Sequence, residues 1–227
     1  MIELLNIDCM EYMAKLPDKA FDLAIVDPPY GIGIGCGAGE TRGDGKKKKD
    51  LYVPKDWDYC KPSDDYWAEL MRVSNNQIIW GGNYFSSSLP ESRGWIYWRK
   101  LMGGSYSDGE LAWTSFDRVL KEFTQRSEQG AKRIHPTQKP VALYQWLLKN
   151  YAKPGDRILD THGGSCSSAI ACDIMGFDAV ICEIDKDYYD AAVERFNRYK
   201  QQQVLDFGGC VDEKTQNQNT MQMPGLR

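Results

Sequence analysis

The stretch Phe21-Asp22-Leu23-Ala24-Ile25-Val26-Asp27-Pro28-Pro29-Tyr30 decides the fold that this sequence predicts. Its first six residues are mostly apolar and favour a buried strand, which the two prolines bring to an end. Open α/β sheets bind their ligands at the carboxyl ends of parallel strands. We therefore expect the residues after Val26 to form part of a binding site at the edge of such a sheet.

These residues suit a flat ring that carries an amino group. The exocyclic amine of a nucleobase is a weak nucleophile because its lone pair is delocalised into the ring, so a catalyst must accept hydrogen bonds from its N–H groups. Asp27 and the carbonyl of Pro28 are candidate acceptors. The two prolines hold the turn rigid, and Tyr30 offers a ring face on which a base can stack. The alternative is a strand that ends in an ordinary Pro-Pro turn.

A second motif lies in the last third of the chain. The stretch 153–165 predicts a turn, a short strand that ends in Asp160, and a small-residue loop, Thr161-His162-Gly163-Gly164-Ser165, that enters a helix over about 166–175. The next predicted strand, 179–182, is followed by Glu183. An acidic residue about twenty positions after a glycine-rich turn suits a ribose diol. Because the G-x-G-x-x-G pattern is missing, we expect a nucleoside cofactor without a pyrophosphate.

Together the two motifs resemble the amino-group DNA methyltransferases that use S-adenosylmethionine, in the permuted order in which the catalytic motif precedes the cofactor motif. The hexapeptide His135-Pro136-Thr137-Gln138-Lys139-Pro140 is typical of the same family. The resemblance implies a Rossmann-like, doubly wound, mostly parallel α/β sheet with an antiparallel edge hairpin. The catalytic residues that it implies are Asp27, Pro28, Pro29 and Tyr30. The cofactor-binding residues that it implies are Asp8, Cys9, His135, Thr137, Lys139, Asp160, His162, Gly163, Gly164, Ser165, Glu183 and Ile184.

The permuted order also predicts where the N-terminus lies. The strand 2–7 is expected beside the strand that precedes Glu183, which brings Asp8 to the adenine ring of the cofactor. The family loop usually has the sequence Asp-Pro-Phe-x-Gly-Ser-Gly. In this chain His162 replaces an aromatic wall of the cofactor site and Cys166 replaces a glycine.

The activity that the resemblance implies is direct methyl transfer to a base flipped out of double-stranded DNA, as in restriction-modification. Adenine N6 is preferred as the target because Asp, and not Ser, stands ahead of Pro-Pro-Tyr. The alternative targets of methylation are cytosine N4, RNA, and a protein amide. The alternative to an enzyme is a catalytically silent module that binds DNA or the cofactor. This chemistry requires neither a metal nor a thiol nucleophile, and the seven cysteines are expected to be reduced and mostly packed.

Length and composition fit one intracellular domain. A chain of 227 residues that is 42% hydrophobic can bury one substantial core. It has no run of about 18 apolar residues, and its N-terminus suggests a strand instead of a signal peptide, so a cytoplasmic protein without a membrane partner is expected. The methyltransferase domain is predicted over 1–205 and a flexible tail over 206–227.

The net charge of −4 predicts that any contact with DNA is local. The loop 31–55, with four lysines at 46–49, is the predicted DNA-binding segment, and its alternative is an idle solvated loop. Other basic candidates are Arg93, Arg99, Lys100, Lys132 and Arg133. A second subunit of a homodimer could also supply DNA contacts.

Periodicity predicts the remaining elements. Helices are expected over 9–16, 63–73, 141–151 and 187–199. Strands are expected over 77–80 and 94–98, and the segments 111–116 and 118–123 are predicted to pair as a hairpin. We expect Trp95, Trp98 and Trp113 to pack on the sheet before any role in base stacking.

Overall fold

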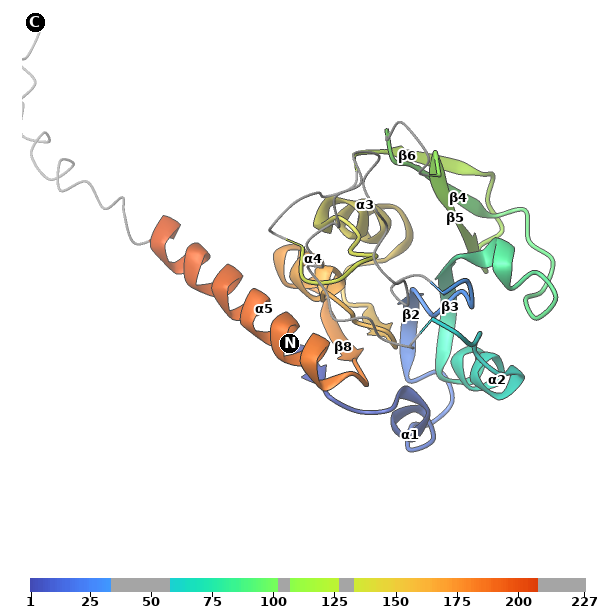
Figure 1. Cartoon of the computed structure of the whole chain (residues 1–227), viewed down its shortest axis with the longest axis horizontal. Helices are drawn as coiled ribbons and strands as arrows, with labels where there is room; N and C mark the ends of the chain where they lie inside the picture. Colours follow the sequence, from blue (N-terminus) through green and yellow to red (C-terminus); the bar gives the residue numbers. More distant parts are fainter. Residues whose placement is uncertain (34–57, 102–106, 127–132, 208–227) are drawn as a thin grey trace, which may run out of the picture.

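The structure is a computed structural model that describes residues 1–33, 58–101, 107–126 and 133–207. Within these residues one sheet is covered by helices on both faces (Figure 1). Its strands are β1 (Ile2–Leu5), β2 (Phe21–Val26), β3 (Ser74–Trp80), β4 (Trp95–Arg99), β5 (Gly109–Thr114), β6 (Lys121–Thr124), β7 (Arg157–Asp160) and β8 (Asp178–Cys182). The helices are α1 (Cys9–Met13), α2 (Asp64–Val73), the 3-10 helix η1 (Gly82–Tyr84), α3 (Val141–Tyr151), α4 (Ser167–Met175) and α5 (Lys186–Phe207).

The strand order across the sheet is β1-β8-β7-β2-β3-β5-β4-β6. The first five strands of this order are parallel to one another, so their carboxyl ends meet at one edge. The chain continues outward from β2 to β3 on one side and from β7 to β8 on the other. The boundary between β2 and β7 is therefore a topological switch point, which is where open α/β sheets bind ligands. Asp27, after β2, and Asp160, at the end of β7, both lie there.

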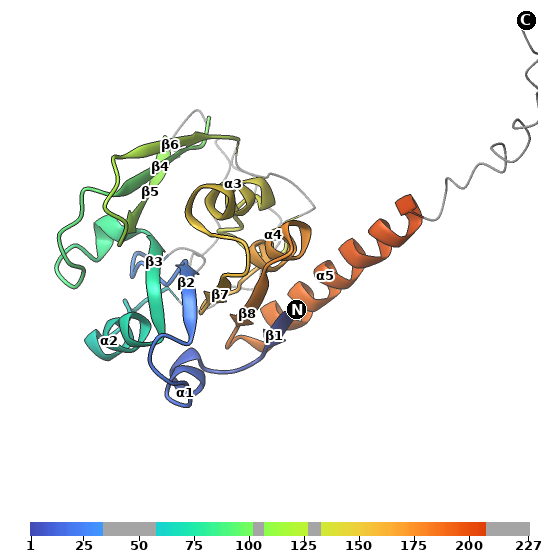
Figure 2. The ribbon, with the colours of Figure 1, turned by 180° about the vertical axis from the view of Figure 1, so that it is seen from behind.

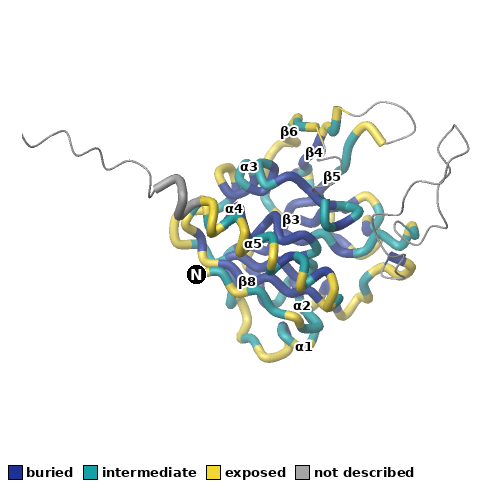
Figure 3. The backbone as a smooth tube through the Cα atoms, turned by 60° about the vertical axis from the view of Figure 1, so that its left-hand side comes forward, coloured by how far each residue is buried: buried dark blue, intermediate teal, exposed yellow. Residues whose placement is uncertain are grey.

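Side chains alternate along the central strands and build a core on each face of the sheet. Leu23 and Ile25 of β2 pack in a core with α3 and α4, whereas Ala24 and Val26 pack in a second core with α1 and α2. Figure 3 shows the buried strands enclosed by helices whose outer sides are exposed. This two-sided burial confirms the predicted doubly wound fold.

The three tryptophans pack on the sheet, as predicted. Trp98 is 1% exposed and lies in the core with α3 and α4. Trp113 is 4% exposed and packs with the partly buried Trp95 on the other face.

The first strand closes one edge of the sheet. β1 pairs in parallel with β8, from Ile2 opposite Ala179 to Leu5 opposite Cys182, which confirms the placement predicted for the N-terminus. Asp8 then begins α1, because its side chain accepts a hydrogen bond from the Met10 amide at 2.8 Å. At the other end of the chain, α5 starts beside β1 and extends beyond the sheet (Figures 1 and 2).

The predicted hairpin between 111–116 and 118–123 is wrong. β5 pairs antiparallel with both β3 and β4, whereas β6 pairs in parallel with β4. The burial of the two segments explains the difference: the second half of β5 is buried and its two edges are paired, while β6 is largely exposed and takes the outer edge. Because β5 is antiparallel to β3 and β4, its first residues, Gly109 and Glu110, lie at the edge of the sheet where the parallel strands end.

Several predictions concern residues outside the described ranges. The proposed DNA-binding loop, 31–55, is described only as far as Gly33, and Lys132 is also outside. Of the predicted tail, 206–227, only residues 206 and 207 are described, and they belong to α5. None of the described helices combines the length and the apolar composition that crossing a membrane requires.

The core under α2 generates a test of the fold. Leu70 is fully buried between this helix and the sheet. We expect Leu70→Ala to lower the free energy of unfolding by about 2–5 kcal/mol, because it removes buried methyl groups and leaves a cavity. Ile174→Ala, at a position 44% exposed, should change it by only about 0.5 kcal/mol. Urea denaturation of both variants measures the difference, and equal losses would contradict the packing described.

Candidate active site

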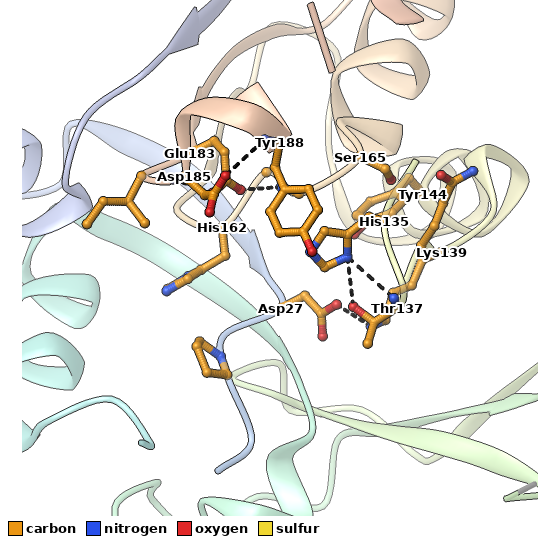
Figure 4. Close-up of a pocket in the computed structure, with 15 residues that line it drawn as sticks. Asp27, His135, Thr137, Lys139, Tyr144, His162, Ser165, Glu183, Asp185 and Tyr188 are labelled. Atoms are coloured by element: carbon orange, nitrogen blue, oxygen red, sulfur yellow. Dashed lines mark hydrogen bonds and ion pairs between the residues drawn. The ribbon is translucent and has the colours of Figure 1, made fainter. Parts of the chain in front are cut away.

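A cavity of about 250 Å³ lies at the switch point and collects side chains from both motifs (Figure 4). The end of β2, the loop after β7, the end of β8, the hexapeptide and the start of α5 all contribute to it. The residues that line it are Asp27, Pro29, His135, Thr137, Gln138, Lys139, Tyr144, His162, Gly163, Gly164, Ser165, Glu183, Ile184, Asp185 and Tyr188.

Asp27 is held by a lysine and a tyrosine. Its Oδ2 lies 2.5 Å from Lys139 Nζ, and its Oδ1 accepts a hydrogen bond from the Tyr30 hydroxyl at 2.6 Å. The Lys139 side chain is only 2% exposed and forms a second ion pair with Glu110 at 3.1 Å. Glu110 in turn pairs with Lys100. Two carboxylates therefore face two ammonium groups, which makes the burial of these charges tolerable.

Burial and the neighbouring opposite charges shift the pKa values of this cluster in opposite directions. Burial raises the pKa of Asp27, and Glu110 adds to the rise although Lys139 opposes it. Burial alone would lower the pKa of Lys139, but the carboxylates of Asp27 and Glu110 outweigh burial and raise it. The pKa of Glu110 is lowered because Lys139 and Lys100 outweigh burial. Asp27 is thus a carboxylate that takes up a proton more readily than an exposed aspartate does.

The ring of Tyr30 is fixed by its neighbours. It stacks on Tyr84 with ring centroids 5.0 Å apart and an interplanar angle of 16°, and Phe85 approaches it edge-on. Gly81 has a φ of +71°, and a Cβ at this residue would lie 2.2 Å from a ring atom of Tyr30. A glycine at the end of β3 is therefore needed for the ring to occupy this position.

Asp58 anchors the turn that follows the catalytic motif. Its Oδ1 accepts hydrogen bonds from the Tyr30 amide at 2.7 Å and from the Gly31 amide at 3.0 Å. The residue is 2% exposed. This buried carboxylate, together with the prolines, fixes the backbone between β2 and the undescribed segment.

The glycine-rich loop after β7 is tied to both neighbouring strands. Asp160 accepts hydrogen bonds from Ser168 Oγ at 2.6 Å and from the His162 amide at 3.1 Å. Burial raises the pKa of Asp160 to about 7, against the effect of these hydrogen bonds. Gly163 has no room for a side chain, because a Cβ would lie 2.4 Å from Ile181.

Glu183 connects this loop with the end of β8. Its two carboxylate oxygens accept hydrogen bonds from the Gly164 amide at 2.7 Å and from the Asp185 amide at 2.8 Å. A carboxylate oxygen has two lone pairs and can accept more than one hydrogen bond. Glu183 can therefore hold the loop and still accept hydrogen bonds from a ligand in the cavity.

His162 is a neutral ring in a hydrogen-bonded chain. Its Nδ1 lies 2.9 Å from Thr161 Oγ1, which lies 2.7 Å from the Tyr66 hydroxyl. The ring of Tyr66 also packs edge-on against the His162 ring. Burial lowers the pKa of His162 to about 4, so the imidazole is uncharged at neutral pH.

The hexapeptide contacts residues on two sides of the cavity, Tyr188 at the start of α5 and Asp27 after β2. His135 Nδ1 lies 3.1 Å from Thr137 Oγ1, and the His135 ring packs edge-on against Tyr188 at 4.4 Å between centroids. The Gln138 side chain connects the hexapeptide to the residue before it by accepting a hydrogen bond from the Ile134 amide at 3.0 Å. Lys139 points instead to Asp27, as Figure 4 shows.

The structure brings together most residues that the sequence predicted for the site, but several of them make contacts other than the predicted ones. Five predicted site residues are not among those that line the cavity: Asp8, Cys9, Pro28, Tyr30 and Asp160. Asp8 caps α1, and Cys9 is the first residue of that helix. Asp160 holds the loop by its hydrogen bonds to Ser168 and the His162 amide, and Lys139 contacts the Asp27 carboxylate. Lys100, a predicted DNA contact, is 17% exposed and paired with Glu110.

Sequence reasoning missed several residues of the site. Glu110 was hidden because the hairpin prediction gave β5 the wrong neighbours. Asp58 follows a segment without periodicity, and no local signal connects it with the turn at Tyr30. Tyr188 lies at the start of the predicted helix 187–199, where no motif marked it as a site residue.

The chemistry of the cavity suits a cationic ligand that carries a diol. Carboxylates at Asp27, Glu183 and Asp185 line it, and rings of His135 and Tyr188 supply apolar contact. The backbone can approach a ligand closely at Gly164, where φ is +50°. These are groups that S-adenosylmethionine requires, since it has a positive sulfur, an ammonium group and a ribose.

Comparison with known proteins agrees with this chemistry. The family model for N6/N4 DNA methylases matches residues 61–194. The type II methyltransferase M.HpaI of Haemophilus parainfluenzae is 24% identical over 238 residues, which cover 84% of this chain and 72% of that protein.

Solved structures show the same fold. The M1.HpyAVI–SAM complex has a TM-score of 0.58 at 20% identity, over 86% of this chain and 100% of that one. The PvuII DNA methyltransferase, described as cytosine-N4-specific, has a TM-score of 0.59 at 15% identity, over 90% of each chain. The Rossmann-like architecture is shared with both.

The residue that starts α4 generates a test of the loop geometry. Cys166 is buried and has a φ of 53°, in the left-handed region that favours glycine. We expect Cys166→Gly to be more stable than Cys166→Ala by about 0.5–1 kcal/mol, because alanine keeps the strained backbone. At Cys172, buried within the same helix, the order should reverse, with alanine more stable by about 1 kcal/mol. Chemical denaturation of the four variants gives both differences; the same order at both positions would contradict the strained start of α4.

Proposed function

Because this chain belongs to the N6/N4 family of DNA methylases, we propose that it transfers a methyl group from S-adenosylmethionine to the N6 amine of adenine in DNA. The observation that carries the proposal is the cavity that Asp27 shares with Glu183. Asp27 follows the strand on one side of the switch point, and Glu183 follows a strand on the other side. A target amine and a cofactor bound to these two residues would meet in one space.

The β7–β8 side would hold the cofactor. Bound S-adenosylmethionine supplies a methyl group on a positively charged sulfur. Glu183 accepts hydrogen bonds from the ribose hydroxyls, and its own hydrogen bonds to the loop keep it in position. Because His162 is neutral, it forms a wall of the cavity without repelling a cation.

The β2 side would hold the base. The Asp27 carboxylate and the Pro28 carbonyl accept the N–H groups of the amine, which orients its lone pair towards the methyl group. The base would stack on the ring of Tyr30, which Tyr84 holds in place by stacking at 5.0 Å between centroids. Since the Tyr30 hydroxyl also holds Asp27 at 2.6 Å, the tyrosine orients the acceptor as well as the base.

The DNA itself would be held by local positive charge. The net charge of −4 excludes a generally basic surface. The four lysines at 46–49 are the strongest candidates for phosphate contacts in the sequence. Flipping the target base out of the duplex costs a few kcal/mol, and contacts to the phosphates and to Tyr30 offset this cost.

The choice of adenine over cytosine rests on the family resemblance of Asp27-Pro28-Pro29-Tyr30. Physical chemistry alone does not separate the two amines. Incubation with labelled S-adenosylmethionine and DNA, followed by mass analysis of the nucleosides, decides the matter. N6-methyladenine supports the proposal, N4-methylcytosine replaces it with the cytosine alternative, and cofactor binding without any transfer indicates a silent module.

Asp27 provides the test of catalysis. Asp27→Ala should lower the rate of methyl transfer by about 10²–10⁴-fold, because the amine loses its acceptor. The dissociation constant for S-adenosylmethionine should stay within a few-fold, since the ribose site is intact. Asp65→Asn, on the exposed surface of α2, is the matched control and should leave both quantities unchanged. Retained methyl transfer in Asp27→Ala would rule out the catalytic role.

Glu183 provides the test of the cofactor site. Glu183→Gln should weaken S-adenosylmethionine binding by about 1–3 kcal/mol, because one carboxylate oxygen becomes an amide donor that faces a backbone N–H. Glu194→Gln, on the exposed side of α5, should leave binding unchanged. Calorimetric titration measures both, and unchanged affinity in Glu183→Gln would exclude the proposed ribose contact.

A further inference from the structure

Lys139 forms an ion pair with the Asp27 carboxylate, which is the group proposed to accept hydrogen bonds from the target amine. Its Nζ lies 2.5 Å from Asp27 Oδ2, while the other oxygen accepts from the Tyr30 hydroxyl. Lys139 is 2% exposed and lies over the rings of Trp80 and Tyr30, 5.3 Å and 5.9 Å from their centroids. The ammonium group therefore cannot leave Asp27 for solvent, and it needs another place inside the protein.

Glu110 offers that place. Its Oε2 lies 3.1 Å from Lys139 Nζ as an ion pair, but among the described residues no hydrogen bond of good geometry reaches this buried oxygen. A buried acceptor without a hydrogen bond is unfavourable, and a small shift of the ammonium group towards Glu110 would satisfy it. The other oxygen of Glu110 pairs with Lys100, which keeps the carboxylate in position.

Given the proposed function, we propose that Glu110 is a positioning residue for methyl transfer, which receives the Lys139 ammonium when the target amine takes its place on Asp27. Lys139 moves between two carboxylates and stays buried throughout. When the nitrogen lone pair forms a bond to the methyl carbon, the C–S bond of the sulfonium breaks and its electron pair leaves with a neutral thioether sulfur, so the amine must give up one proton. That proton passes from the nitrogen to Asp27, while the electron pair of the N–H bond remains on the nitrogen.

The two neighbours of Asp27 act on it with opposite signs. The positive charge of Lys139 favours the ionised carboxylate, and the negative charge of Glu110 disfavours it. Lys139→Met should therefore raise the pKa of Asp27, and Glu110→Gln should lower it. Damage to the fold alone has no reason to shift one group in opposite directions in two variants.

The ionisable groups that face Asp27 come from several elements. Tyr30 follows β2, Tyr144 belongs to α3, and Asp160 ends β7, while Lys100, after β4, acts through Glu110. Burial holds the pKa of Tyr30 and of Tyr144 well above the ordinary value of a tyrosine, so both stay neutral. Asp160 is unchanged in every variant, so its titration is common to all of them.

The experiment measures the pKa of Asp27 in the free protein from the carboxyl ¹³C shift, assigned with Asp27→Asn. We expect the pKa to rise by about 1–3 in Lys139→Met and to fall by about 1 in Glu110→Gln. Glu122→Gln, which changes an exposed carboxylate on the outer strand β6, is the matched control and should not shift it. Shifts in the same direction, or no shift in Glu110→Gln, overturn the inference.

Kinetics supply the second readout. The acidic limb of the pH dependence of kcat/KM should move up in Lys139→Met and down in Glu110→Gln, because Asp27 must be ionised to accept the amine. At the plateau Glu110→Gln should be about tenfold slower, since Lys139 then has Asp27 as its one carboxylate. Wild-type activity in Glu110→Gln would overturn the positioning role. A wild-type protein that methylates no DNA would overturn the proposed function, while the pKa values still test the pairing.

Discussion

The site depends on the parallel pairing of β2 with β7. Leu23 pairs with Ile158 and Ala24 with Leu159, and the Arg157 amide donates to Asp22, 135 residues earlier, at 2.9 Å. The two motifs are far apart in the chain, and this register sets their carboxyl ends side by side. A slip of one residue would turn the side chains of β2 to the wrong face of the sheet and would disrupt both cores. The demand for burial on both faces thus fixes the distance between catalytic and cofactor residues.

The antiparallel strand β5 adds an electrostatic component to this geometry. If this strand were parallel to its neighbours, its last residues would lie at the edge of the sheet where the cavity is. Because β5 is antiparallel, its first residues lie there instead, and Glu110 is one of them. The result is a buried set of alternating charges that runs from Lys100 through Glu110 and Lys139 to Asp27. The Asp27 carboxylate is therefore part of a network in which each charge changes the proton affinity of the next.

The sequence predicted the parallel half of the fold because each of its strands is a short apolar run bounded by turn residues, as Phe21–Val26 illustrates. It also predicted Asp27 and Glu183 as site residues, since each follows such a strand. The partners of β5 could not be predicted, because pairing depends on which edges are free after the central strands have formed. The contacts of Lys139 and Asp58 escaped prediction for the same reason: they join segments with no shared local pattern.

The position of β1 has a consequence for how the chain folds as it is made. β1 is synthesised well before its partner β8, because the two strands are far apart in the chain: the Asn6 side chain donates to the Glu183 carbonyl 177 residues later. At about 5–20 residues per second, β1 waits roughly 10–35 s for this partner. During synthesis an apolar strand with two unpaired edges is thus exposed, and the sheet can close only when most of the domain has emerged.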